Sequence, residues 1–186
     1  MKFGIRYKKE EKKSFDYVKF EKNLLAEIEA FAKKQSDNKD DIYIMSVEYF
    51  PEFTTYVAVR VNSYSDLKKN VGESEKYYTY YKYCEEEWGL CECLEDSSKE
   101  LQVEYKKMEE KYDDVQFDEW QREHAVKIFS VCKTVMKKFK ETDTYKMFPT
   151  LYLNVYMRER FTKEEILQVF CELNGEGSRE EYSNWL

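Results

Sequence analysis

Glycine, proline and histidine are all scarce in this sequence. Its 186 residues contain 5 glycines, 2 prolines and 1 histidine. So few glycines and prolines exclude a flexible or polyproline linker, and we expect one globular domain over residues 1–186. The single histidine, His124, is the imidazole through which any histidine-dependent catalysis or metal binding would have to pass.

Long apolar runs are also missing. No stretch approaches the roughly 20 apolar residues that span a bilayer, and the lysines of residues 1–10 precede no apolar segment of the kind found in signal peptides. We therefore expect a cytoplasmic protein that binds no membrane. In that reducing compartment we expect free thiols rather than disulfides at the five cysteines, Cys84, Cys91, Cys93, Cys132 and Cys171.

The charge balance is acidic. Against 31 lysines and arginines stand 38 aspartates and glutamates, which gives a formal net charge of −7. This charge opposes non-specific attraction to nucleic-acid backbones, so we expect no nucleic-acid partner. It suits a basic protein partner better.

Apolar residues recur at two different periods along the chain. Spacings of three and four predict helices over residues 17–31, 94–112, 120–139 and 166–173, with Asp118 as the cap of the third and a Thr162–Glu165 capping box for the fourth. Alternation predicts a hairpin of two strands over residues 42–49 and 57–61, and further strands over 77–83 and 151–157. Helices and strands thus mix without regular alternation. This order predicts an α+β fold with a single mainly antiparallel sheet of about four strands and helices packed on one face.

The most unusual stretch runs from Tyr77 to Trp88. It holds five tyrosines before three consecutive glutamates and the tryptophan. We interpret the tyrosines as a strand with amphipathic rings on both faces, because tyrosine favours strands. A stacking platform for bases or sugars would need basic residues that this stretch lacks. Tyrosine and tryptophan are also favoured at protein interfaces, so exposed members would favour a protein partner.

Three groups of residues are candidates for a chemical site. His124 lies on an apolar helical stripe, which favours a buried core residue over a base or ligand. The spacing of Cys91 and Cys93 matches neither a zinc ribbon nor a redox pair, and the adjacent carboxylates of residues 85–87 fan apart instead of converging. We therefore predict no catalytic residue, no metal site and no cofactor.

Two segments resemble a known family. The aromatic and acidic stretch ends in Glu87 and Trp88, and the chain closes with Leu173 and Asn174 followed by an acidic helix and Trp185. These segments are similar to those of an uncharacterised bacterial family, domain of unknown function four-three-zero-three, over most of the chain. The resemblance brings no catalytic residues with it. It implies a role like that of immunity proteins, which are small, cytosolic, frequently acidic and bind a toxin domain tightly.

These observations support one leading hypothesis and two alternatives. The leading hypothesis is a non-enzymatic protein-binding module, such as an immunity protein that occludes a toxin domain, with a contact surface formed by Glu85, Glu86, Trp88, Tyr78 and Tyr80. The first alternative is an enzyme or small-ligand binder that uses carboxylates and His124 in a pocket beside the sheet. The second is a homodimer formed through exposed tyrosines.

Overall fold

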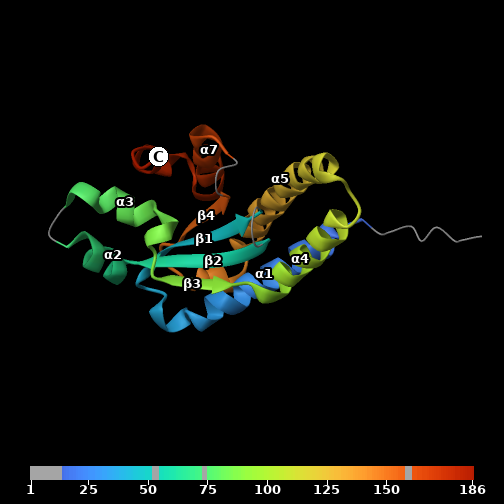
Figure 1. Cartoon of the computed structure of the whole chain (residues 1–186). Helices are drawn as coiled ribbons and strands as arrows, with labels where there is room; N and C mark the ends of the chain where they lie inside the picture. Colours follow the sequence, from blue (N-terminus) through green and yellow to red (C-terminus); the bar gives the residue numbers. More distant parts are fainter. Residues whose placement is uncertain (1–13, 52–54, 73–74, 158–160) are drawn as a thin grey trace, which may run out of the picture.

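The computed structural model describes residues 14–51, 55–72, 75–157 and 161–186. It confirms the predicted α+β fold, in which helices surround one four-stranded sheet (Figure 1). The strands are β1 (Ile42–Phe50), β2 (Tyr56–Ser63), β3 (Leu90–Cys93) and β4 (Tyr152–Met157), in the spatial order β3-β2-β1-β4.

Most of the strand pairing is antiparallel. β2 pairs antiparallel with both β1 and β3, whereas β4 runs parallel to β1. The structure confirms the predicted hairpin, which consists of β1 and β2, and part of its connection lies outside the described residues.

Helices make up the rest of the regular structure. The α-helices are α1 (Tyr17–Lys34), α2 (Tyr64–Val71), α3 (Tyr78–Tyr83), α4 (Glu95–Glu109), α5 (Asp114–Phe139), α6 (Asp143–Lys146), α7 (Lys163–Asn174) and α8 (Arg179–Ser183). The 3₁₀ turns are η1 (Ser36–Asn38), η2 (Glu75–Tyr77), η3 (Glu85–Glu87) and η4 (Glu176–Ser178).

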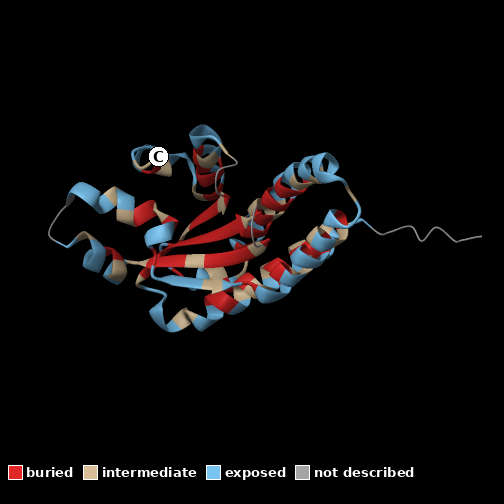
Figure 2. Ribbon diagram, in the orientation of Figure 1, coloured by how far each residue is buried: buried red, intermediate tan, exposed pale blue. Residues whose placement is uncertain are grey.

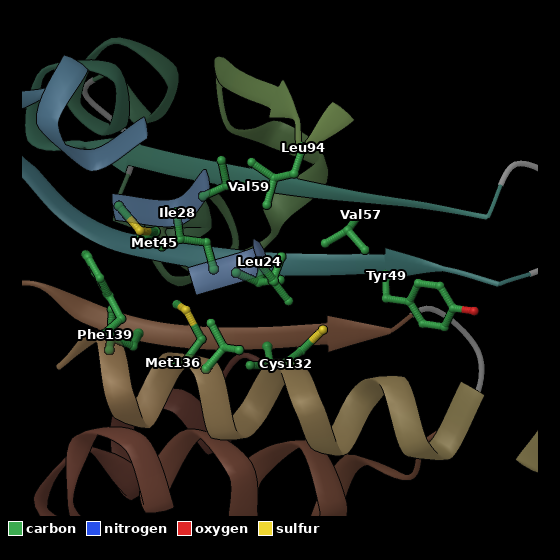
Figure 3. Packing of buried hydrophobic residues seen from close by; sticks show 14 of the residues in the cluster. Leu24, Ile28, Met45, Tyr49, Val57, Val59, Leu94, Cys132, Met136 and Phe139 are labelled. Atoms are coloured by element: carbon green, nitrogen blue, oxygen red, sulfur yellow. The ribbon is translucent and has the colours of Figure 1, made fainter. Parts of the chain in front are cut away.

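One face of the sheet, here called the first face, packs against α1, α4 and α5. Alternate residues of the three longer strands point into this layer, and Met45, Val59 and Leu153 are fully buried in it. Figure 3 shows side chains from α1, α5 and the strands meeting in this layer. Figure 2 shows the same division along the helices, whose sheet-facing sides are buried while their outer sides are exposed.

The opposite face, here called the second face, is covered in part by α2, α3, α7 and α8. A second apolar cluster joins Leu67, Tyr83, Phe170 and Tyr182 from these four helices. Helices therefore lie on both faces, not on one alone as we expected from the sequence. α3 and α8 are too short to carry a long apolar stripe, so the sequence did not predict a second layer of helices.

A β-bulge changes the direction of side chains at the start of β1. Ile42 pairs with Ser63 and Ile44 pairs with Asn62, so Tyr43 is an extra residue in β1. Tyr43 and Ile44 consequently both join the second apolar cluster. The bulge places the Tyr43 hydroxyl beneath α3, where it matters for the site described below.

The strand predicted over residues 77–83 is wrong. Residues 78–83 form the helix α3, and the strand that completes the sheet is β3, further along the chain. Within α3, Tyr83 is buried while Tyr78 and Tyr80 are exposed. Tertiary packing of one helical face therefore overrides the strand preference of tyrosine.

The helix boundaries were predicted unevenly. The capping box is confirmed, because the Thr162 hydroxyl accepts from the Glu165 N–H while the Glu165 carboxylate accepts from the Thr162 N–H. α5 begins one turn before the expected cap, since Asp113 rather than Asp118 accepts the first-turn N–H of Gln116. Within the described ranges, no helix combines the length and the apolar character that crossing a bilayer requires.

Candidate functional site

Four tyrosines are exposed on the arm formed by α2, η2 and α3. Tyr64, Tyr77, Tyr78 and Tyr80 expose 45%, 51%, 39% and 44% of their surface, and we call this group the tyrosine surface. α2 and α3 pack against each other. The phenol groups of Tyr64 and Tyr78 each lie near the phenol of Tyr43. The arm lies at the end of the sheet away from the α4–α5 turn (Figure 1).

The inner side of α3 anchors the arm by apolar contacts. Tyr83 is 1% exposed and meets the rings of Phe170 and Tyr182 edge to face, with centroids 5.9 and 5.1 Å apart. Lys82 is also buried and forms an ion pair with Glu181 of α8. The exposed rings therefore project from a helix whose other side is fixed.

Polar side chains of the sheet anchor the C-terminal end of α3. The last carbonyls of a helix have no partner within it and must find one elsewhere. Here the Asn62 amide donates to the Tyr81 carbonyl and the Tyr43 hydroxyl donates to the Lys82 carbonyl, each at 2.9 Å. The Arg60 guanidinium donates to the Glu85 carbonyl at 3.3 Å. The sheet thus supplies the donors that hold α3 and η3 in place.

Two carboxyl groups are buried beneath η3. Glu48 and Glu85 are each 2% exposed, and both lie on the second face. Glu48 accepts from the Arg60 guanidinium at 2.8 Å. The Glu85 carboxyl lies 2.6 Å from the Asn154 amide nitrogen, which in turn lies 3.1 Å from the Tyr182 hydroxyl.

Burial raises the pKa of both acids. Loss of hydration raises the pKa of Glu85 to about 8, with the Glu48 carboxylate adding to the increase. The pKa of Glu48 is raised for the same reason, although the Arg60 charge opposes the increase. Glu85 is therefore mostly neutral at pH 7, a charge state that its sequence position among three glutamates does not suggest.

Several polar atoms around these acids lack a hydrogen-bond partner. They are the Ser46 hydroxyl, the Trp88 indole nitrogen and the Asn154 amide oxygen, all buried on the second face or at its cover. Ser46 and Asn154 are directly paired across β1 and β4. Buried polar groups without a partner are uncommon, and among the described side chains the other one is His124 Nε2, on the first face.

The five residues predicted as a contact surface fall into two groups. Tyr78, Tyr80 and Glu86 are exposed, and the Tyr80 hydroxyl donates to Glu87 at 2.9 Å. Glu85 and Trp88 are 2% and 4% exposed, so neither side chain is offered to a partner in this conformation. The prediction missed that η3 turns these two side chains inward, because the Glu-Glu-Glu run carries no sequence signal that distinguishes Glu85 from its neighbours.

Two exposed tyrosines were not among the predicted contacts. Tyr77 belongs to the same stretch but was assigned to a strand face. Tyr64 is the first residue of α2, and nothing in the sequence around it indicates that α2 lies beside α3. Only the folded arrangement of the two helices unites them.

His124 lies in the apolar layer of the first face. It is 4% exposed, stacks on Trp120 with ring centroids 4.7 Å apart, and shares a 2.8 Å hydrogen bond between its Nδ1 and the Tyr17 hydroxyl. Burial lowers the pKa of His124 to about 4, with the Lys127 charge adding to the decrease. The ring is therefore a neutral core residue that no solute reaches in this conformation.

The cysteines do not converge. All five are free thiols: Cys91 and Cys93 are exposed on β3, Cys132 and Cys171 are buried in separate clusters, and Cys84 is intermediate. Among the described residues, no three histidine, cysteine, aspartate or glutamate side chains come together in a way that would hold a metal ion. The exposed Cys91–Cys93 pair is the result of strand alternation in β3.

Comparison of the chain with protein-family models, with curated proteins and with solved structures finds no match.

Proposed function

We propose that this protein is a non-enzymatic binding module whose tyrosine surface contacts another protein. The observation that carries the proposal is the group of four exposed tyrosines on an arm whose inner side is fixed to the sheet. Tyrosine supplies a large contact area with few rotatable bonds, and its hydroxyl forms hydrogen bonds at the edge of an interface. Rings that are already held in place lose little further freedom on binding.

The charge of the chain indicates the kind of partner. The net charge is −7, and the exposed carboxylates of Glu86 and Glu87 lie next to the exposed rings of α3. A basic surface on the partner would be attracted to this region and steered toward it. Occlusion of a basic toxin domain by an immunity protein is the specific form of the proposal, and the acidic net charge is the observation that supports it.

The alternative of an enzyme or ligand binder gains no comparable support. It requires His124 and carboxylates in one pocket, but His124 packs on the first face while Glu48 and Glu85 lie on the second. The sheet separates them. His124 also has its Nδ1 occupied by Tyr17 and its ring covered by Trp120.

Purification of the protein together with the product of the adjacent gene tests the proposal. We expect a stable complex, and cells that express this chain should survive expression of that product if it is a toxin. Absence of both complex formation and protection would refute the immunity role.

Variants of the tyrosine surface test the contact itself. Replacement of Tyr78 and Tyr80 by serine should weaken the complex by roughly 30-fold or more, as expected when two central aromatic contacts are lost. Tyr112→Ser, a tyrosine change at the α4–α5 turn, provides the matched control and should leave affinity unchanged. Equal affinity of all three proteins would remove the tyrosine surface from the interface.

Sedimentation velocity of the purified chain separates this proposal from homodimer formation. A monomer leaves the tyrosine surface available to a different protein. A dimer that is broken by the Tyr78→Ser and Tyr80→Ser changes would assign the surface to self-association instead.

A further inference from the structure

Glu85 connects the tyrosine surface to the second face of the sheet. It is the first residue of η3, directly after the segment that ends α3. Its side chain is buried while those of Glu86 and Glu87 are exposed. The carboxyl group that follows α3 is therefore withdrawn from water.

The nearby charged and titratable groups come from several elements. β1 contributes Glu48, β2 contributes Arg60, α8 contributes Tyr182 and the adjoining residue of the segment is Cys84. Arg60 directs its hydrogen bonds to the Glu48 carboxylate and to the main-chain oxygen of Glu85. The carboxyl group of Glu85 thus sits beside a second acid, while the hydrogen bonds of the guanidinium go to other atoms.

The partner of the Glu85 carboxyl is compatible with a proton on it. The Asn154 amide lies 2.6 Å away, a short distance for an N–H donor and an ordinary one for an O–H donor. A 180° rotation of the amide exchanges its nitrogen and oxygen. The oxygen, which otherwise has no partner, would then accept from a protonated Glu85 and from the Tyr182 hydroxyl.

We propose that a proton on Glu85 locks α3 and η3 against the second face, and that loss of this proton loosens residues 78–88. An ionised carboxylate gains full hydration only when the segment lifts, because in the buried site desolvation and the neighbouring Glu48 carboxylate outweigh the favourable charge of Arg60. Lifting also breaks the three hydrogen bonds from Asn62, Tyr43 and Arg60 to the carbonyls of the segment. The lock therefore controls the whole end of the arm.

The direction of the pH effect follows from linkage. The pKa of Glu85 is raised from 4.5 to about 8 in the closed state, so the open state holds fewer protons throughout this interval. The closed state is consequently favoured at low pH, loses this advantage as pH rises from 4.5 to about 8, and changes no further above that range. The raised pKa of Glu48 acts in the same direction, whereas the raised pKa values of Cys84 and Tyr182 place their titration above this window.

Hydrogen exchange of the free protein tests the lock. We expect the protection factors of residues 78–88, after correction for intrinsic exchange, to fall by up to about 100-fold between pH 6 and pH 8, while those of β1 stay constant. Glu85→Gln keeps the shape but cannot ionise, so the fall in its protection with pH should be much smaller than in the natural protein, with only the contribution of Glu48 remaining. Glu86→Gln changes an exposed neighbour and should behave like the natural protein. Constant protection in the natural protein, or an unchanged slope in Glu85→Gln, would overturn the proposal.

A second measurement needs no variant. The side-chain carboxyl of Glu85, followed by carbon-13 NMR during a pH titration, should change its shift with a midpoint near 8. A midpoint near the ordinary value for glutamate would show that the group is ionised in the closed state and would overturn the lock independently of how the variants fold.

The consequence for binding rests on the proposed function, but the lock does not. If the tyrosine surface binds a protein, alkaline pH should weaken the complex of the natural chain and spare that of Glu85→Gln. Hydrogen exchange and NMR are performed without a partner. Failure to find a partner therefore leaves the lock testable, and failure of the lock leaves the binding proposal intact.

Discussion

The two faces of the sheet are stabilised in different ways. The first face is filled by apolar side chains, mainly from α1, α4 and α5 with a smaller share from α7, and these include the fully buried Phe139 and Ile28. The second face buries polar strand residues such as Asn62, Asn154 and Glu48 under short helices. Apolar burial is non-directional and depends little on pH, whereas a buried polar layer requires particular hydrogen bonds and particular protonation states. Conformational change should therefore concentrate on the second face.

The largest expected effect comes from breaking the first face. Phe139→Ala removes a fully buried ring from the end of α5 and leaves a cavity, so the free energy of unfolding should fall by about 3–5 kcal/mol. Chemical denaturation followed by circular dichroism measures this loss. Val126→Ala, in the same helix but 58% exposed, should change stability by less than about 0.5 kcal/mol. Similar losses in both variants would contradict the assignment of Phe139 to a close-packed core.

The second largest effect concerns the histidine of the first face. The pKa of His124 is lowered from 6.5 to about 4, so the folded state binds fewer protons than the unfolded state in that interval. Stability from this group is present above pH 6.5 and is lost as pH falls toward 4, by up to about 1.4 kcal/mol for each pH unit. Denaturation curves between pH 7 and pH 4 measure the decline.

A double variant isolates this contribution from that of the carboxylates. Replacing both Tyr17 and His124 by phenylalanine removes the titrating ring together with its hydroxyl partner, so no buried polar group is left without its bond. The double variant should lose less stability toward pH 4 than the natural protein. Parallel curves would indicate that His124 accepts a proton without opening the core.

Much of the first face could be predicted from the sequence. The apolar periods of α1 and α5, and the alternation in β1, β2 and β4, are long enough to show which residues face the core. The Thr162–Glu165 cap could also be predicted, because its signal lies within four consecutive residues. The parallel pairing of β4 with β1 could not be predicted, because it joins segments about 100 residues apart in the chain.

The candidate site was much less predictable. The tyrosines of α3 have the composition of a strand. The carbonyls at the end of this helix and in η3 accept hydrogen bonds from Asn62, Tyr43 and Arg60, and nothing in the local sequence of residues 77–88 indicates these distant donors. The inward position of Glu85 likewise depends on Asn154, distant in the chain. Tyr78 and Tyr80 were proposed as contacts because of their residue type, and the sequence did not show which tyrosines are exposed.

A smaller effect should follow from breaking the second face at Asn62. Its amide donates to the Tyr81 carbonyl and the Tyr43 hydroxyl, so Asn62→Ala leaves two buried groups short of a donor, at a cost of about 1–3 kcal/mol. We expect this cost to appear as local opening of residues 78–88, measured by hydrogen exchange. Asn23→Ala is the matched control, because that amide donates to Glu100 at the α1–α4 contact and should leave α3 unaffected. Uniform loss of protection over the whole sheet would contradict the local character of the second face.

The smallest effect concerns α7, which contributes side chains to both faces. Val169 and Leu173 belong to the first cluster, and Leu167 and Phe170 to the second. Thr162→Ala removes the cap of this helix and should lower the free energy of unfolding by about 1 kcal/mol. Thr134→Ala, whose hydroxyl donates to the Ser130 carbonyl within α5, is the control without a capping role and should cost less. Because α7 joins both clusters, hydrogen exchange in Thr162→Ala should increase near Phe170 and near Leu173 alike. Faster hydrogen exchange near Phe170 alone would show that apolar contacts on the first face keep α7 folded there without its cap. The two faces would then open separately although they share this helix.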